Sequence, residues 1–243
     1  KNFFKNLVFK FLFKVPKKII VNSKDFKREI DRRFNINTKV IYNPLNIKEI
    51  KNLGNKRFKL PFFKNAKIKA INIARFTDQK DHMTLLKTFL VLIKKKIDIK
   101  LLIVGYGANK IKMKNFILQN KISENVKIIN FQKNPYKFLK KSNLFILTSL
   151  YEGLPNVLLE AMVLKKFIIS SNCPTGPREI LKNGKLGMLF KIGDKKDLSN
   201  KILNFNNNIK TNNKITYHAY KSLDRFDYKS NCEEYFKTVK EFI

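Results

Sequence analysis

The amino-acid sequence predicts an α/β fold, a Rossmann-like parallel sheet with helices on both faces. Two observations support this prediction. Short β-rich runs alternate with amphipathic stretches along most of the chain, which is typical of parallel strands joined by crossover helices. The expected strands are also continuous apolar runs, such as "IKLLIVG" at 99–105, and do not alternate with polar residues. Both faces of the sheet should therefore be covered.

The individual elements follow from these patterns. Runs rich in Ile, Val and Phe predict strands at 17–22, 39–43, 67–74, 99–105, 126–131, 143–149, 166–171 and 187–190. Amphipathic stretches predict helices around 80–96, 108–121, 135–141, 155–164, 176–182 and 194–204, with one or two more in 212–242. Lysines interrupt the aromatic stretch 3–13 and no small-residue cleavage site follows it. We expect a helix that is buried against a neighbouring domain there, and an interfacial membrane helix is the alternative.

The chain divides into four parts by composition. The first part ends at Asn43-Pro44, where proline interrupts regular structure. Because the first residue is Lys1 and not Met, we expect the chain to be part of a longer polypeptide. The four parts are a leading segment (1–43), a polar linker (44–65), the main domain (66–211) and carboxyl-terminal helices (212–243).

The composition is strongly basic, with 52 Lys and Arg against 18 Asp and Glu and a formal net charge of +34. Such a charge attracts polyanions, including nucleic acid, anionic membranes and phosphate-bearing substrates. Only seven of the basic residues are arginines, and the lysines are scattered along the whole chain. Because base recognition relies on arginine, we expect no specific nucleic-acid partner and favour a solvated lysine-rich surface.

Cysteine and histidine are too sparse to suggest a metal site. Cys173, Cys232, His82 and His218 are isolated and lack metal-ligand spacing, so we expect no metal and no cofactor. Two ordinary thiols fit a reduced, cytoplasmic protein. No apolar run approaches the ~20 residues that a transmembrane helix needs.

The stretch "YEGLPNVLLEAM" at 151–162 places two glutamates around the start of a helix. Gly153 allows a ligand to approach the backbone, and Pro155 suits a first helical turn. The free amides of that turn would favour an anion such as a diphosphate, and Glu152 and Glu160 could accept hydrogen bonds from sugar and ribose hydroxyls. The two glutamates are equally compatible with ordinary turn and surface positions of a helix.

Two further stretches follow expected strands at the same carboxyl edge of the sheet. "INIARFTDQKDH" at 71–82 supplies Arg75 and Lys80, whose charges suit the two phosphoryl groups of a diphosphate. Arg75 carries more weight, because arginine is scarce in this chain. "VGYGANK" at 104–110 supplies Gly105, which either cradles a ligand or only makes a tight turn. This stretch is not a dinucleotide fingerprint, because the third glycine is missing.

Together these motifs resemble the carboxyl-terminal half of a group-1 glycosyltransferase, of glycosyltransferase family 4 with the GT-B fold. The resemblance covers nearly all of 17–240. "IIVNSKDFKREI" and "VIYNPLN" resemble the family's passage from first to second domain, and "YEGLPNVLLEAM" resembles its E-x7-E motif. "ARFTDQKDHMTLLKTF" is similar to the G-R-x-x-x-x-K segment, with Ala74 in place of the glycine, and "CPTGPREIL" to the P-x-G-x-x-E-I element.

The resemblance implies a retaining transfer of sugar from a nucleotide diphosphate sugar, with UDP expected, to a hydroxyl acceptor without a metal. Arg75 and Lys80 would bind the diphosphate, and Glu152 would hold the donor sugar. These three are the expected catalytic residues, and no protein nucleophile is assigned. The expected donor-binding residues are Glu160 for the ribose, the backbone around Gly153, Leu154, Asn156 and Val157, and Gly105.

The resemblance also implies that 1–43 is a remnant of an acceptor domain that is mostly missing, and that 212–243 crosses back toward it. The acceptor would be a lipid-linked or polysaccharide precursor, reached by a peripheral protein at the inner, anionic face of the cell membrane. Alternatives remain open. They are a sugar-nucleotide epimerase of related fold, which would need a histidine in the cleft, a nucleic-acid-binding module, and a donor-binding fragment that is inactive alone.

Overall fold

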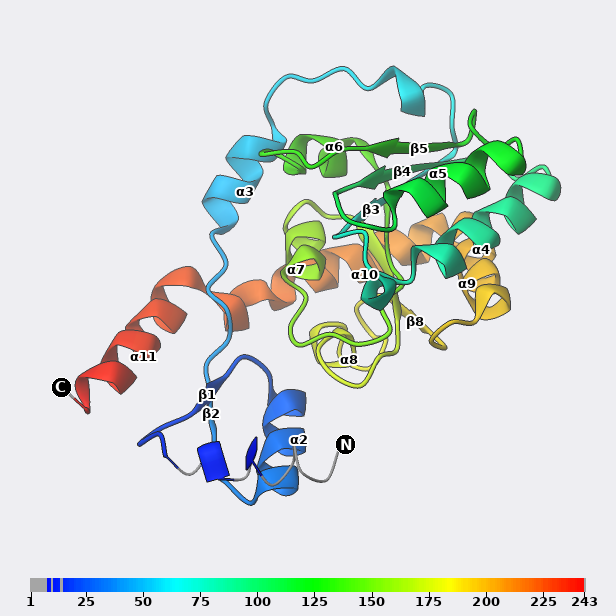
Figure 1. Cartoon of the computed structure of the whole chain (residues 1–243). Coiled ribbons are helices and arrows are strands. Elements are labelled where there is room, and N and C mark those ends of the chain that lie inside the picture. The colour runs from blue at the N-terminus through cyan, green and yellow to red at the C-terminus, as the bar shows by residue number, and fades with distance from the viewer. Residues whose placement is uncertain (1–7, 10, 14, 243) are drawn as a thin grey trace.

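Six parallel strands form the central sheet of the structure, a computed structural model that describes residues 8–9, 11–13 and 15–242 (Figure 1). The strands are β3 (Ile68–Ile73), β4 (Ile99–Val104), β5 (Val126–Ile129), β6 (Leu144–Leu147), β7 (Phe167–Ser171) and β8 (Met188–Phe190). Their order is β5-β4-β3-β6-β7-β8, and every pair is parallel. From β3 the successive strands are added toward one edge of the sheet, and from β6 they are added toward the other edge. The boundary between β3 and β6 is the switch point, and ligands of such sheets bind there, at the carboxyl ends of the strands.

Helices cover both faces of this sheet, which confirms the predicted fold class. The first face carries α4 (His82–Lys94), α5 (Lys110–Gln119) and α9 (Lys195–Asn207). The second carries α3 (Ile47–Gly54), α6 (Tyr136–Lys141), α7 (Asn156–Val163), α8 (Pro177–Ile180) and α10 (Ile209–Lys221). Neighbouring strand residues enter opposite cores, as Ala70 and Ile71 do in β3. This two-sided burial explains why the strands are apolar without alternation.

A small two-stranded sheet lies beside the large one, at the lower end of the view in Figure 1. It pairs β1 (Ile20–Val21) with β2 (Lys39–Val40), and α2 (Lys24–Phe34) connects them. The last helix, α11 (Tyr228–Lys240), contacts this unit: Lys39 donates to Thr238 Oγ1 at 2.8 Å, and the Tyr235 hydroxyl donates to the Ile41 carbonyl at 3.4 Å.

The chain passes between the two sheets twice, at positions that lie side by side. It enters the large sheet after Tyr42 and leaves it through a short 3-10 segment, η3 (Ser222–Phe226). The Leu45 amide donates to the Phe226 carbonyl at 3.0 Å, and Leu45 forms an isolated parallel bridge with Asp227. The two connections are therefore tied to each other.

The observed elements differ from the predicted ones mainly in the segment 44–65. All eight predicted strands are present with shorter ends, but the segment predicted as a linker contains α3 and a 3-10 turn, η1 (Pro61–Phe63). Ile50 and Phe63 are buried in the main core. Asn46 caps α3, and its side chain accepts from the Glu49 backbone amide at 3.1 Å. This asparagine is hard to recognise as a helix cap in the sequence because the residues around it are also polar. Helix α10 begins at Ile209, so the predicted boundary at 212 falls inside it.

Two predictions concern the ends of the chain and the membrane. The helix predicted for 3–13 falls mostly outside the described residues, although Phe13 packs against Phe34 of α2 with ring centroids 4.8 Å apart. Within 8–9, 11–13 and 15–242, no helix has the length and apolar character needed to cross a bilayer.

Candidate functional site

Two loops meet at the switch point of the sheet. One follows β3 and includes the 3-10 turn η2 (Asp78–Lys80), and the other follows β6. The Leu150 amide donates to the Gln79 carbonyl, the Thr148 hydroxyl donates to the Lys80 carbonyl, and the Gln79 side chain donates to the Tyr151 carbonyl, each at 2.8 Å. These bonds fix the two predicted site segments against each other before any ligand binds.

The pair Lys80 and Glu152 lies between these loops. The Lys80 ammonium is 2.5 Å from Glu152 Oε1, and the Ser149 hydroxyl donates to the same oxygen at 2.6 Å. The side chains are only 14% and 8% exposed, so the ion pair is largely shielded from water. Glu152 Oε2 has no hydrogen bond to the described residues and remains available to a ligand. The structure thus brings together two of the three predicted catalytic residues.

Arg75, the third predicted catalytic residue, lies apart from this pair. Its guanidinium is exposed and has no hydrogen bond or ion pair with the described part of the chain. It lines a cavity of about 160 Å³ together with Gly105, Tyr106 and Phe131. The Tyr106 and Phe131 rings meet edge to face at 5.8 Å and are 57% and 62% exposed. Sequence reasoning missed both aromatic residues, although each lies two positions after the end of a strand.

The start of α7 presents a group of unpaired amides. The backbone N–H groups of Gly153, Leu154, Asn156 and Val157 have no acceptor among the described residues. The next amide, that of Leu158, donates to the Pro155 carbonyl at 3.0 Å and is therefore not free. Four unpaired donors at and just before a helix start form a suitable cradle for an anion.

The side chains of this segment differ in what they can contact. Leu154 is buried in the core, so only its backbone can reach a ligand. The Asn156 side chain accepts from the side-chain amide of Asn43 at 2.8 Å, which connects the site to the segment after β2. A Cβ placed on Gly153 would meet only Asn22 Oδ1, at 3.8 Å. The protein itself therefore does not require glycine at position 153.

A third loop, from 172 to 177, supports the second one from behind. The Thr175 hydroxyl donates to the Glu152 carbonyl. Gly176 has φ +84°, and a Cβ there would lie 2.1 Å from the Gly153 carbonyl oxygen. Only glycine fits such a position, so Gly176 lets this loop pack closely beneath the amide cradle.

Glu160 occupies a different environment from Glu152. It lies one turn into α7, and the Tyr136 hydroxyl at the start of α6 donates to its Oε1 at 3.4 Å. Burial raises the pKa of Glu160 to about 7, against a smaller lowering by Tyr136. Burial, with Glu160 adding, raises the pKa of Tyr136 to about 12. Such a shifted carboxyl group is typical of functional sites, which favours the predicted binding role of Glu160 over an ordinary surface position.

The glycines after β4 have a structural explanation. A Cβ on Gly105 would lie 1.9 Å from the Ala74 carbonyl oxygen, and one on Gly107 would lie 2.6 Å from the Phe76 carbonyl oxygen. Both glycines let the loops after β3 and β4 approach each other. Close packing therefore suffices to explain Gly105, and its predicted contact with a donor stays a prediction.

Neither histidine nor cysteine supplies a reactive group to this site. His82 is 2% exposed, and burial, with a contribution from Lys80, lowers its pKa to about 4. Burial, followed by the charge of Glu152, raises the pKa of the buried Cys173 to about 11. His218 lies on α10, away from the switch point. No observation therefore favours the epimerase alternative, which needs a histidine in the cleft.

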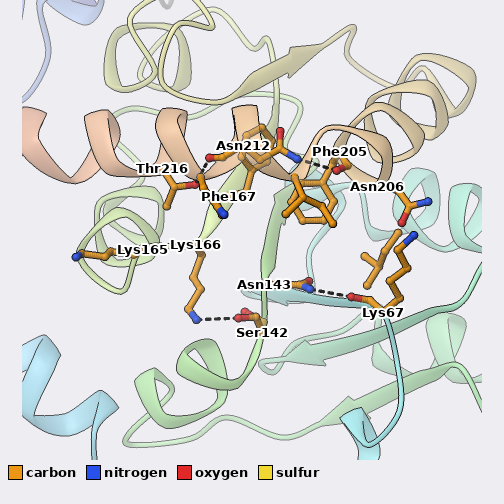
Figure 2. Close-up of a pocket in the computed structure, with 13 residues that line it drawn as sticks. Lys67, Ser142, Asn143, Lys165, Lys166, Phe167, Phe205, Asn206, Asn212 and Thr216 are labelled. Carbon is orange, nitrogen blue, oxygen red and sulfur yellow. Dashed lines mark hydrogen bonds between the residues drawn. The ribbon is translucent and has the colours of Figure 1, made fainter.

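Another cavity, of about 230 Å³, lies at the opposite, amino-terminal ends of the strands (Figure 2). Its polar groups serve the fold. The Lys166 ammonium donates to the carbonyls of Lys140 and Ser142 at 2.7 Å each, and the Asn143 side chain donates to the Lys67 carbonyl at 2.8 Å. This cavity contains none of the predicted site residues.

Comparisons with known proteins agree with this arrangement. The family model described as "Glycosyl transferases group 1" matches residues 54–222. An uncharacterized glycosyltransferase of Methanocaldococcus jannaschii is 38% identical over 181 residues, which cover 72% of this chain and 44% of that protein. N-acetylgalactosamine-N,N'-diacetylbacillosaminyl-diphospho-undecaprenol 4-alpha-N-acetylgalactosaminyltransferase of Campylobacter jejuni is 29% identical over 205 residues, 82% of this chain and 54% of that protein. The chain thus spans about half the length of these relatives.

Solved structures show the same fold. TarM has a TM-score of 0.77 at 24% identity, over 90% of this chain and 43% of that chain. Anabaena HepE, solved in complex with UDP and glucose, has a TM-score of 0.80 at 19% identity, over 93% of this chain and 63% of that chain. Since the family model matches more than half of the residues, the chain belongs to the group 1 glycosyl transferases.

Proposed function

We propose that this chain binds a nucleotide diphosphate sugar, with UDP as the nucleotide, and serves a glycosyltransferase that moves the sugar to a hydroxyl acceptor with retention of configuration and without a metal. The observation that carries the proposal is the shielded pair of Lys80 and Glu152 at the switch point, together with the exposed Arg75 and four unpaired amides at the same carboxyl edge of the sheet.

Each part of the donor has a partner of matching chemistry. The diphosphate suits the amides at the start of α7, the free guanidinium of Arg75 and the ammonium of Lys80, because all of them donate to anionic oxygens. The base suits the cavity with Tyr106 and Phe131, whose exposed rings offer apolar contact. We assign Glu160 to the ribose, and Glu152 Oε2, which has no partner among the described residues, to a hydroxyl of the sugar.

The chemistry proposed for these residues is electrostatic. As the bond between sugar and diphosphate breaks, negative charge grows on the diphosphate, and Arg75, Lys80 and the amides of α7 stabilise it. Each charge-assisted hydrogen bond contributes about 1.5–3 kcal/mol. Because Lys80 is already held by Glu152, its position changes little when the donor arrives, which reduces the cost of reorganisation. No side chain is assigned as a nucleophile.

The proteins similar to this chain support the donor and the acceptor class. HepE was solved with UDP and glucose, and a TarM mutant was solved with UDP. The name of the Campylobacter jejuni relative describes a diphospho-undecaprenol substrate. We therefore infer a lipid-linked or polysaccharide precursor as acceptor. The net charge of +34 would attract an anionic membrane surface that carries such an acceptor.

Calorimetric titration with UDP, GDP and ADP at physiological salt tests the donor site. We expect saturable binding of UDP that Arg75→Ala weakens about tenfold, the effect of losing one charge-assisted contact. Arg57→Ala is the matched control, because Arg57 is also exposed and lies outside the site. Equal, weak and salt-sensitive heats for all three nucleotides, or equal losses in the two variants, would refute the donor site and indicate general attraction to lysines.

A further inference from the structure

The backbone pairing between the two strands at the switch point is short. β3 pairs with β4 along all six residues of the strand, but with β6 only at Ala70 and Ile71. Beyond Ile71, β3 and β6 have no further paired residues. Lys80 and Glu152, which follow these two strands, are nevertheless in contact. Something other than the backbone ladder has to set the distance between the two strand ends.

A buried side chain joins β3 to β6 just beyond their last paired residues. Asn72, the residue after the last pair, is 0% exposed, and its side-chain amide donates to the Ile146 carbonyl in β6 at 2.9 Å. A polar side chain inside an apolar strand is costly unless it is hydrogen-bonded. Here the side-chain bond lies where the next backbone contact between β3 and β6 would fall.

His82 holds this asparagine from α4. Its Nε2 lies 3.1 Å from Asn72 Oδ1, and its ring packs edge to face on Phe76 with centroids 5.3 Å apart. Because the Asn72 amide donates to Ile146, Oδ1 is the acceptor, so Nε2 must carry the proton of the neutral ring. His82 Nδ1 is buried without a partner among the described residues. One N–H group of the imidazole is therefore sufficient for this role.

The same histidine terminates the loop that carries Lys80. The loop is held at Lys80 by the Thr148 hydroxyl, which belongs to the β6 side, and two residues later by the contact of His82 with Asn72. The first fixed point links the loop after β3 directly to the β6 side. The second reaches the β6 side through Asn72, whose side-chain amide donates to Ile146. The position of the Lys80 ammonium relative to Glu152 thus depends on these two connections.

We propose that Asn72 and His82 are positioning residues that set the spacing between the loops after β3 and β6 and thereby the alignment of Lys80 with Glu152 for the donor diphosphate. This inference rests on the proposed function. Neither residue touches the ligand, and both act through the loop after β3. Displacement of a catalytic group by about 1 Å can lower activity up to about 100-fold, so such indirect control has a measurable effect.

Two substitutions of His82 and one control test the proposal by UDP calorimetry on folded protein. His82→Leu removes the N–H group and should weaken UDP binding about tenfold. His82→Gln keeps an N–H donor at a similar reach and should restore affinity to within about twofold. Thr88→Val is the control. Thr88 is a buried residue of the same helix, and its hydroxyl donates to the Thr84 carbonyl, away from the loops after β3 and β6. We expect Thr88→Val to lower stability without changing UDP affinity.

The outcomes separate this inference from the proposed function. Unchanged UDP affinity in His82→Leu, or no recovery in His82→Gln, would overturn the positioning role while leaving the donor site intact. If the unsubstituted chain binds no nucleotide, the proposed function fails, and a crystal structure of His82→Leu decides the inference instead. A Lys80 ammonium that still lies within hydrogen-bonding distance of Glu152 would refute it, and a displaced one would support it.

Discussion

At the scale of single residues, the site consists of groups that the protein holds and groups that it leaves free. Lys80 and Glu152 are held by each other and by Ser149, whereas Arg75 and the amides of α7 have no partner among the described residues. The held groups need no rearrangement and the free groups have unmet hydrogen-bonding capacity. This division is what a preorganised anion site requires.

Gly153 provides a direct test of the amide cradle. Gly153→Ala should leave the free energy of unfolding within about 0.5 kcal/mol, because the added Cβ would meet only Asn22 Oδ1, at an ordinary contact distance of 3.8 Å. It should weaken UDP binding about tenfold, since the methyl group would occupy the approach to the diphosphate. Calorimetry and urea unfolding measure the two effects.

The control for this test is Gly176→Ala, which should lower stability by about 1–3 kcal/mol because of its positive φ and its close approach to the Gly153 carbonyl. Unchanged UDP affinity in Gly153→Ala would show that no ligand group approaches this glycine.

Glu160 predicts a dependence of stability on pH. Burial raises its pKa to about 7 from 4.5, so the folded state keeps a proton that the unfolded state releases between these values. The stability contribution of this group therefore falls as pH rises from 4.5 to 7, and the full penalty, at most about 3 kcal/mol, is present above pH 7. Glu160→Gln should be more stable than the unsubstituted chain at pH 8, and this advantage should shrink toward pH 5.

Urea unfolding at both pH values measures the advantage of Glu160→Gln. Glu124→Gln is the control, because Glu124 is exposed and should show no such difference. An equal effect of Glu160→Gln at both pH values would contradict a buried, charge-sensitive carboxyl group.

The sequence could predict which residues lie at the carboxyl edge of the sheet but not which side chains they contact. Arg75, Lys80 and Glu152 were found because each follows an apolar run, and the carboxyl ends of parallel strands share one edge. The contact of Lys80 with Glu152 joins residues 72 positions apart, and no local pattern encodes it. Tyr106, Phe131 and Tyr136 were missed because aromatic residues are common in this chain, with 22 Phe and 8 Tyr, so their positions alone do not mark a site.

At the scale of elements, Glu179 joins the two sheets. Its carboxylate accepts from the amides of Lys24 and Asp25, at 3.1 and 3.0 Å, and from the Tyr42 hydroxyl at 2.5 Å. The acceptor at the start of α2 thus comes from α8 of the large domain. Arg225 completes the contact by donating to the carbonyls at both ends of the Glu179–Ile180 step, at 3.1 and 2.6 Å.

Removal of this carboxylate should loosen α2 selectively. Glu179→Ala leaves two helix-start amides and the hydroxyl of the half-buried Tyr42 unpaired, which should lower stability by about 1–3 kcal/mol. Hydrogen exchange should accelerate at the amides of Lys24 and Asp25 more than in β3. Glu29→Ala, an exposed glutamate on α2 itself, should change neither quantity. Uniform acceleration across both sheets would contradict a local role for Glu179.

Helix α3 shows where element prediction fails. Its sequence, IKEIKNLG, is short and lies between asparagines, so it resembles the polar segments around it. What makes it a helix is burial of Ile50 in the core beside α6 and α7, which is a tertiary contact. Short helices depend on such packing because their own hydrogen bonds barely offset the cost of nucleation.

At the scale of the whole molecule, the fold was predictable because composition and topology agree. Six strands buried on both faces need continuous apolar runs, and the crossover helices fill the intervals between them. The location of the small sheet was not predictable, because its contacts with α11 and Glu179 join residues far apart in the chain.

The net charge of +34 predicts that salt stabilises the protein. The described residues contain only five ion pairs, so most lysines repel one another without compensation. An increase from about 0.01 to about 0.15 M NaCl shortens the screening length from about 30 to about 8 Å and should raise the melting temperature. Sodium fluoride at equal ionic strength should have the same effect if screening is the cause. A melting temperature that falls with salt would contradict this explanation.

The two connections at Leu45 and Phe226 have a mechanical consequence. A single connecting segment would act as a swivel, but two segments laid parallel and joined by a hydrogen bond behave like a strap hinge, which bends in one plane and resists torsion. Rotation of the small sheet relative to the large one would therefore be restricted to a single axis. Rotation away from the large sheet would also have to break the hydrogen bonds from Lys24 and Asp25 to Glu179.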